Sequence, residues 1–244
     1  MSEEDESAHP LERAIILDDE NPIMRIDVKK SEVPIENELD EYIYLCGQTL
    51  AAISTSIEKS KIAIEILTCS NQLPPKDSQF NTAEYIEYAI ENYFIRSSTV
   101  YDRCMVFTNR LLNLGIANQS ILHELIVSND HVKNLGLAAL LKKVRKKCTE
   151  YRVERNSIVH HGRYSDEKFS TVSAMHKANQ LSAKSGKEEP ISPKAIEKYT
   201  DDIISMRVNE FSDHISSIEE QVSEFYDAAL PIYEAKKAEI RVRL

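Results

Sequence analysis

The chain has 244 residues, 42% of them hydrophobic and 29% charged, with only 5 glycines, no tryptophan and a net charge of −10. This composition excludes a wholly disordered chain, because it can bury a substantial core, and the scarcity of glycine favours long helices over many short strands. No apolar run approaches the roughly 20 residues that cross a bilayer. The acidic N-terminus, Met1 to Glu6, lacks the pattern of a secretory signal. We therefore expect a cytoplasmic protein without a membrane-spanning segment.

The cysteines give no sign of a metal site. Cys46, Cys69, Cys104 and Cys148 are widely spaced and form no C-x-x-C pair. Since structural zinc sites use closely spaced ligands, we expect small buried thiols in a reducing compartment, and neither a metal nor a cofactor.

Residues 1–34 are expected to form an N-terminal extension, either a tail or a short hairpin. An acidic tail covers about residues 1–8. Two short β-branched runs, residues 14–17 and 23–28, flank the turn-forming residues 18–22, an arrangement typical of a β-hairpin.

Two long helices are predicted next. Helix-forming residues dominate positions 35–69, and Pro74-Pro75 ends that helix because proline lacks a backbone N–H and its ring clashes with the preceding turn. Residues 81–114 carry a seam at alternating spacings of four and three: Ile86, Ile90, Tyr93, Ser97, Val100, Cys104, Phe107 and Leu111. Such a seam is typical of helix bundles, and Gly115 follows where a C-terminal cap belongs.

The second half of the chain is predicted to be helical as well. A short helix over residues 120–128 precedes a long one over residues 130–161, with Asp130 as its N-cap and Gly162 just past its end. Residues 169–181 form a weak helix, and residues 182–190 form a flexible connection. The last long helix begins at Ser192-Pro193, and Pro231 breaks or kinks it before a basic C-terminal segment, residues 231–244. Together these helices predict an antiparallel bundle over residues 35–230.

Positive charge gathers between Lys142 and Arg163. Eight basic residues there stand against two glutamates, a net charge of +6 that leaves −16 for the rest of the chain. Such a basic stripe can hold a phosphate while the remainder of the protein repels bulk polyanion, or it can be the solvated face of a helix. The sequence leaves both interpretations open.

One short motif carries recognisable chemistry. Glycine-rich phosphate loops and a nucleophile elbow are absent, whereas Arg155-Asn156 is followed by a histidine at His160, with His161 beside it. This pattern resembles the hallmark of the HEPN superfamily, in which an arginine, often with asparagine next to it, precedes a histidine by a short interval. The resemblance implies an all-α antiparallel bundle of HEPN type, with its core at about residues 80–230 and an N-terminal extension.

A second match to the same spacing, Arg207 with His214, lies inside the last long helix. No asparagine follows Arg207, and we interpret this pair as surface residues on one helix face. The match at Arg155 is preferred because Asn156 adjoins it, because the basic stripe ends there, and because side chains near a helix end can converge on a cleft.

Helical geometry sets a condition on the motif. Asn156 and His160 share a helix face with Arg152, whereas Arg155 is turned about 140° away from His160. HEPN proteins form homodimers that bring two motifs to one cleft, and a homodimer would resolve this divergence.

The resemblance implies a metal-independent endoribonuclease of the kind found among toxins and defence effectors. His160 would take the proton from a ribose 2′-hydroxyl, Arg155 would stabilise charge on the phosphoryl oxygens, and Asn156 would hold the ribose or phosphate or orient His160. His161 could replace His160 as the base. The alternative is a non-catalytic HEPN module, a homodimer that binds a nucleotide, an RNA or a partner protein.

Further residues and partners follow from the same resemblance. The residues expected to bind RNA phosphates are Arg152, His161, Arg163, Lys146 and Lys147. Asp102, preferred to Glu91 and Tyr101, would support the motif from an earlier helix. Besides RNA or a nucleotide, the expected partners are a second copy of the chain and an antitoxin or a nucleotidyltransferase. One HEPN branch has a modifiable tyrosine two residues after the histidine, but Gly162 stands there in this chain and Tyr164 comes later, which argues against that scheme.

Overall fold

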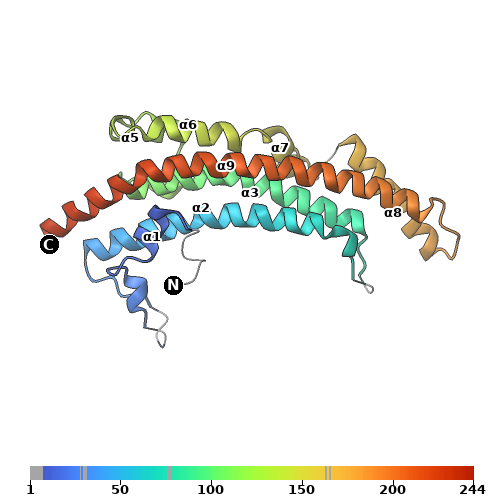
Figure 1. The fold of residues 1–244 in the computed structure, drawn as a ribbon, viewed down its shortest axis with the longest axis horizontal. Helices are drawn as coiled ribbons and strands as arrows, with labels where there is room; N and C mark the ends of the chain where they lie inside the picture. Colours follow the sequence, from blue (N-terminus) through green and yellow to red (C-terminus); the bar gives the residue numbers. More distant parts are fainter. Residues whose placement is uncertain (1–7, 28, 30–31, 76–77, 163, 165) are drawn as a thin grey trace. The chain divides into compact units, whose positions relative to one another are not determined.

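The fold is all-helical. The computed structural model describes residues 8–27, 29, 32–75, 78–162, 164 and 166–244. These residues form helices and no β-strand, which confirms the predicted all-α class (Figure 1). The longest helices are α2 (Glu38–Thr68), α3 (Thr82–Leu111) and α9 (Pro193–Arg243). Within the described part of the chain, no helix is both long enough and apolar enough to cross a membrane.

The chain divides into two compact units, and α2, α3 and α9 contribute to both. Unit 1 comprises residues 1–55, 99–148 and 218–244. Unit 2 comprises residues 56–98 and 149–217.

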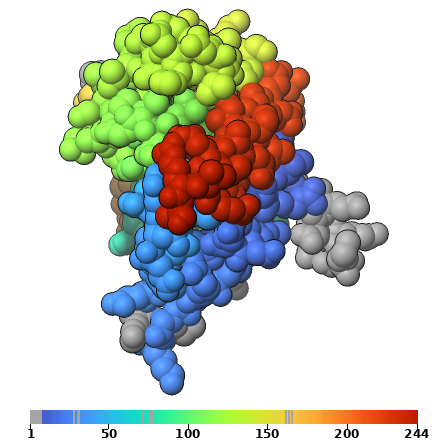
Figure 2. Space-filling view, turned by 90° about the vertical axis from the view of Figure 1, so that its left-hand side faces the viewer, coloured from blue at the N-terminus to red at the C-terminus, as the bar shows by residue number. Residues whose placement is uncertain are grey.

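Unit 1 adds short helices to parts of α2, α3 and α9. These are α1 (Pro10–Ile16), η2 (Pro22–Arg25), η4 (Asn118–Ser120), α4 (His123–Val127), α5 (Asp130–Asn134) and α6 (Leu137–Cys148). In Figure 2 the end of α9, in red, lies between the N-terminal segment in blue and the α4–α6 segment in green. The core of unit 1 includes Ile43, Leu50, Phe107 and Phe225, which are fully buried. The rings of Phe107 and Phe225 meet edge to face at 6.0 Å, which joins α3 to α9.

The end of α9 is held to the N-terminal segment by polar contacts. The buried carboxylate of Asp18 accepts hydrogen bonds from the Tyr233 hydroxyl at 3.0 Å and the Lys237 ammonium at 2.6 Å, and Glu20 pairs with Arg241. The helix continues through Pro231 to Arg243, so a break at Pro231 is wrong. The basic C-terminal segment is therefore helical and partly neutralised.

The expected N-terminal hairpin is wrong. Residues 10–16 form α1 and residues 22–25 form a 3₁₀ helix, although the Asp27 N–H bonds to the Glu32 carbonyl at 3.1 Å. The cause is a capping box: the His9 side chain accepts the Leu11 N–H, and Glu12 accepts the His9 N–H. These bonds satisfy backbone N–H groups that have no partner within the first turn of a helix. Pro10 favours the same turn because its ring fixes φ near the helical value. Residues 1–7 of the expected tail lie outside the described residues.

The long helix expected over residues 130–161 is three helices. Gly136 adopts a left-handed φ of 76° and ends α5, which is capped by Asn129 and not by the predicted Asp130. A second interruption follows Cys148, and α7 begins at Arg152. No glycine or proline marks this second break. Tyr151 explains it, because its side chain turns inward to meet Phe94 and Phe211.

Unit 2 is built from the end of α2, the 3₁₀ turn η3 (Ser70–Gln72), the start of α3, α7 (Arg152–His161), α8 (Glu167–Lys184) and the first half of α9. Its core is aromatic: Tyr93, Phe94, Phe169 and Phe211 are buried, and the Tyr93 and Phe211 rings stack at 3.9 Å. Figure 1 shows α8 beside the first half of α9, and the His176 ring bonds to the Thr200 hydroxyl there. As predicted, α9 begins at Pro193, and the Ser192 hydroxyl accepts the Ala195 N–H.

Candidate functional site

The Arg155-Asn156-x-x-x-His160 motif lies on α7, in unit 2. Gly162, with a φ of 82°, ends this helix and donates its N–H to the Ile158 carbonyl at 3.1 Å, as the sequence predicted. Ile158 is buried, so it fixes which side of α7 faces the unit. The opposite side, with Arg152, Asn156 and His160, is then turned to solvent.

The motif side chains differ in their surroundings. Arg155 and Asn156 are half-buried, and the Arg155 Nη1 donates to the Asn156 Oδ1 at 3.1 Å. His160 is exposed, and nothing in the described part of the chain hydrogen-bonds to its ring. The arginine is therefore held against the asparagine, while the imidazole is open to a ligand.

Because α7 is continuous from Arg152 to His161, the angular separation expected from the sequence applies. Arg155 and His160 are about 140° apart around the axis and about 7.5 Å apart along it. The two side chains therefore leave the helix in different directions, although the Arg155 guanidinium turns towards Asn156, which lies on the same face as His160. A single compact ligand therefore meets both groups only if the long guanidinium reaches round the helix or a second protomer contributes.

Two valines flank the motif on the solvent side of α7. Val153 is 79% exposed and Val159 is 50% exposed. Val153 is seven residues before His160 and shares its face, whereas Val159 is four residues after Arg155 and lies on the Arg155 side of the exposed surface. Apolar side chains on this face are unusual for a purely solvated helix.

The other residues expected to bind phosphate are spread over both units. Arg152 is exposed on α7 in unit 2. Lys146 and Lys147 belong to α6 in unit 1, whose opposite face buries Leu137, Leu141 and Val144. On the same helix, Lys143 pairs with Glu224 at 2.7 Å. Arg163 and the side chain of His161 lie outside the described residues.

The supporting carboxylate expected from an earlier helix has two candidates in the structure. Asp102, the preferred one, is exposed on the part of α3 that belongs to unit 1. Glu91 lies on the part of α3 in unit 2, and its carboxylate accepts the backbone N–H of Tyr164 at 2.7 Å. Glu91 is thus the carboxylate that contacts the segment directly after the motif helix.

The second Arg–His match is not on the surface, so that interpretation is wrong. The His214 residue is 5% exposed and the Arg207 side chain is 14% exposed. His214 Nδ1 bonds to the Tyr93 hydroxyl at 2.7 Å, and its Nε2 lies 3.8 Å from Glu150. The spacing of α9 carried a signal of this burial that we missed: Arg207 is four residues before the buried Phe211, and His214 is four residues before the buried Ile218, so both lie on the apolar side of the helix.

Arg207 is the centre of a polar cluster, defined here as Tyr151, Tyr164, Asp166, Arg207 and Glu210. Its guanidinium donates to Asp166 at 2.8 Å, to Glu210 at 2.5 Å and to the Tyr164 hydroxyl. Tyr164 in turn donates to Asp166, and Tyr151 donates to Glu210 at 2.7 Å. The Arg207 Nε is buried without a hydrogen-bond partner among the described residues.

Tyr164 is only 2% exposed, and its hydroxyl is engaged by both Asp166 and Arg207. Burial raises the pKa of Tyr164 and its hydrogen bond to Asp166 raises it further. A partner enzyme that modifies tyrosine hydroxyls would find this one inaccessible, which agrees with the sequence argument against that scheme.

The Asp166 carboxyl gives the cluster a pH dependence. Burial raises its pKa, but hydrogen bonds from Tyr164, the Phe169 amide and Arg207 outweigh burial, so the net pKa lies below the usual value. A carboxyl whose folded pKa is depressed stabilises the fold above its unfolded pKa of about 4, and this contribution is lost as pH falls through the folded pKa.

We expect Asp166→Asn to lower the free energy of unfolding at pH 7 by roughly 1–3 kcal/mol, since the variant loses the charge-assisted hydrogen bond with Arg207 while asparagine still caps α8. The deficit should shrink at pH 3. Urea denaturation at both pH values measures it, with the exposed Asp19→Asn as control. An equal deficit at pH 3 and pH 7 would contradict the role of the charge.

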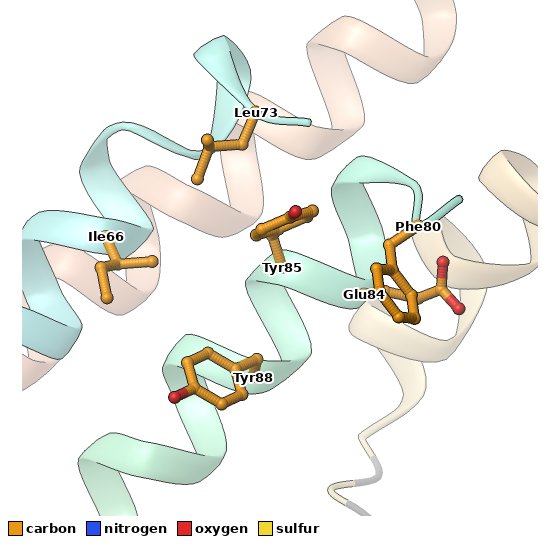
Figure 3. A pocket seen from close by; sticks show the side chains of 6 residues that line it. All are labelled: Ile66, Leu73, Phe80, Glu84, Tyr85 and Tyr88. Atoms are coloured by element: carbon orange, nitrogen blue, oxygen red, sulfur yellow. The ribbon is translucent and has the colours of Figure 1, made fainter. Parts of the chain in front are cut away.

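An apolar groove of about 490 Å³ lies elsewhere in unit 2 (Figure 3). It is lined by Ile66, Leu73, Phe80, Glu84, Tyr85 and Tyr88. In Figure 3 the Glu84 carboxylate sits behind the Phe80 ring, and one of its oxygens accepts the Asn81 N–H at 2.7 Å. The groove contains none of the residues that the sequence singled out.

No group of three or more metal-binding side chains occurs among the residues that the structure describes. No curated protein and no solved structure matches the chain at a significant level. A family model described as HEPN_Cthe2314-like HEPN matches residues 36–229. The match includes residues 36–79, which the motif resemblance left out, and it ends before the C-terminal segment. With the RN-x-x-x-H motif on an exposed helix of an all-α fold, and with most of its length matched, the chain belongs to the HEPN_Cthe2314-like HEPN family.

Proposed function

We propose that this HEPN protein is a metal-independent endoribonuclease whose reaction is carried by Arg155, Asn156 and His160. The observation that carries the proposal is the exposed face of α7, where the His160 imidazole is open to solvent beside Asn156. The Arg155 guanidinium adjoins the same asparagine at 3.1 Å. Cleavage of an RNA phosphodiester requires groups of these kinds: a base, a cation and a polar side chain that orients the reactants.

In the proposed reaction, His160 removes the proton of a ribose 2′-hydroxyl. The freed oxygen attacks the adjacent phosphorus, the bond to the 5′-oxygen of the next nucleotide breaks, and that oxygen takes a proton as it leaves. The products are a 2′,3′-cyclic phosphate and a 5′-hydroxyl. Arg155 stabilises the added negative charge in the transition state, where a guanidinium fork suits phosphoryl oxygens. RNA is the substrate because DNA lacks the internal nucleophile.

A second copy of the chain completes this proposed site. Within one protomer, helical geometry places residues 155 and 160 about 140° apart around the axis of α7. A two-fold contact through the exposed face of α7 would cover Val153 and Val159, each worth roughly 1.5–3 kcal/mol when fully buried. It would also bring two motifs together, so the leaving oxygen could take its proton from the second histidine.

A non-catalytic module remains the second candidate, and one observation favours it. A catalytic base is normally oriented by another group, and His160 has no such partner among the described residues. A module of this kind would bind an RNA or nucleotide phosphate through Arg155 without turnover, and its affinity would fall steeply with salt.

The test is cleavage of varied RNAs by purified protein in EDTA. We expect cleavage by the wild type and a loss of about 10²- to 10³-fold in Arg155→Ala, by analogy with removal of a transition-state donor. The control is Arg103→Ala, an exposed arginine on α3 outside the motif. Salt-sensitive RNA binding without cleavage would favour the module, and intact RNA without binding would contradict both functions. An antitoxin that suppresses cleavage would support a role as a toxin or defence effector.

A further inference from the structure

We propose that Arg207 and His214, the second Arg–His pair of the sequence, position the motif helix α7 by holding both of its ends to a single face of α9. The orientation of the His160 side chain would then depend on two residues that do not contact the substrate. The predicted effect on the rate of RNA cleavage rests on the proposed function, whereas the predicted effect on the orientation of α7 rests on geometry alone.

The N-terminal end of α7 is held through Tyr151, the residue just before the first helical turn. Its hydroxyl donates to Glu210 on α9 at 2.7 Å. Its ring meets the edge of the His214 ring at 4.7 Å and lies 5.0 Å from Phe94. His214 is itself fixed by the Tyr93 hydroxyl at 2.7 Å. The start of α7 is therefore bonded to α9 at Glu210 and packed against it at His214.

The C-terminal end of α7 is held through the segment that follows Gly162. Arg207 donates to Asp166 at 2.8 Å and to the Tyr164 hydroxyl, while Asp166 accepts the Phe169 N–H and so caps α8. From the other side, Glu91 of α3 accepts the Tyr164 N–H at 2.7 Å. Tyr164 is thus held by both its backbone N–H and its side chain, and Asp166 is held by its carboxylate.

One guanidinium connects the two ends. Arg207 also donates to Glu210 at 2.5 Å. The carboxylate that accepts the Tyr151 hydroxyl is therefore bonded to the same guanidinium that donates to Asp166. Residues 207, 210 and 214 are three and four positions apart, which places them on one face of α9. Fixing the chain both before and after α7 fixes the rotation of that helix about its axis. That rotation decides where Asn156 and His160 point.

The geometry of the cluster suits it to fixing one arrangement of these segments. The side chains of Arg207, Asp166 and Glu210 are 14%, 27% and 33% exposed. The planar guanidinium makes directional bonds to both carboxylates, so it fixes where they lie relative to each other. Small displacements of a catalytic group can cost a large factor in rate, so these contacts would act on the reaction through the orientation of α7.

The test compares Arg207→Met and Arg207→Lys with the wild type, in RNA cleavage and in amide hydrogen exchange. We expect Arg207→Met to lower kcat by about 10- to 100-fold with KM changed less than about 3-fold, because orientation is lost and not binding. Arg207→Lys, which keeps the charge but not the fork, should recover part of kcat. Amide exchange should accelerate in residues 152–162 and at Tyr164 and Phe169, whose amides depend on the contacts that Arg207 holds, and not in the rest of unit 2.

A double-mutant cycle sharpens the test. Tyr151→Phe removes one hydroxyl, and its effect on kcat should be less than additive with that of Arg207→Met, because both break the same chain of contacts. Additive effects would count against the connection. If Arg207→Met does not fold, Tyr151→Phe and Tyr164→Phe carry the same measurements. Arg103→Met, at an exposed arginine, is the matched control.

The outcomes separate this inference from the proposed function. If wild type cleaves RNA and Arg207→Met keeps wild-type kcat, the positioning role is overturned and the nuclease stands. If wild type does not cleave RNA, the proposed function fails, and hydrogen exchange decides the inference: faster exchange confined to residues 152–162, Tyr164 and Phe169 supports it, and unchanged or uniformly faster exchange overturns it.

Discussion

Replacing His160 by alanine is expected to lower the rate of RNA cleavage by about 10²- to 10⁴-fold, the usual contribution of a general base. The side chain is exposed, so its removal should leave the free energy of unfolding nearly unchanged. The measurement is single-turnover cleavage of one RNA oligonucleotide in EDTA, combined with urea denaturation of the same protein.

His131→Ala is the matched control for this experiment. His131 is an exposed histidine on α5, outside unit 2 and outside the motif. Cleavage should be unchanged in this variant. If His160→Ala cleaves RNA as fast as the wild type, His160 is not the base, and His161→Ala then tests the neighbouring histidine in the same assay.

Replacing Phe211 by alanine should destabilise the protein by about 3–5 kcal/mol, the range for deleting a fully buried aromatic ring. Phe211 is 0% exposed, stacks on Tyr93 at 3.9 Å and meets Phe94 edge to face at 5.2 Å. Its removal would leave a cavity under α7, between α3 and α9. The loss is measured as the free energy of unfolding in urea.

The control is Phe80→Ala, because Phe80 is half-exposed in the apolar groove of unit 2. That variant should lose about 1 kcal/mol or less. Equal losses for Phe80→Ala and Phe211→Ala would contradict the aromatic core described for unit 2.

The long helices could be predicted because their signals are local and repeated. The seam from Ile86 to Leu111 lies within α3, the prolines at 74–75 follow α2, and Ser192-Pro193 begins α9. The apolar periodicity of a helix can be recognised without knowing which element the helix packs against. The cap at Gly162 was predicted correctly, since a left-handed C-cap has a strong residue preference, but Asn129 and not Asp130 caps α5, and Asn113 takes the left-handed φ after α3 before Gly115 is reached.

The errors arose where tertiary contacts or weaker signals decide the structure. The N-terminal run around Ile15 is β-branched, yet the cap formed by His9 and Glu12 makes it helical. The break before Arg152 depends on Tyr151 turning into the aromatic core, which no local pattern announces. The C-terminal part of α9 continues past Pro231, and there Tyr233 and Lys237 bond to Asp18, which is 215 and 219 residues away in sequence.

The candidate site was found from sequence through one short motif, and its face could be derived from helical spacing. The burial of Arg207 and His214 was missed because both residues are polar, although each is four residues before a buried apolar residue of α9, Phe211 and Ile218 respectively. Only the packed structure brings Tyr151, Asp166 and Tyr164 against that part of α9. The contact of Glu91 with the residue after the motif helix was likewise hidden, since the two positions are 73 residues apart.

The most direct test of the motif's role uses two oligonucleotides that differ by one oxygen. One is a DNA strand with a single ribonucleotide and the other is its all-deoxy counterpart, each incubated with wild type and His160→Ala in EDTA. We expect cleavage only by the wild type and only after the ribonucleotide, leaving a 2′,3′-cyclic phosphate. Cleavage of the all-deoxy strand, or equal cleavage by His160→Ala, would contradict attack by a ribose hydroxyl that His160 activates.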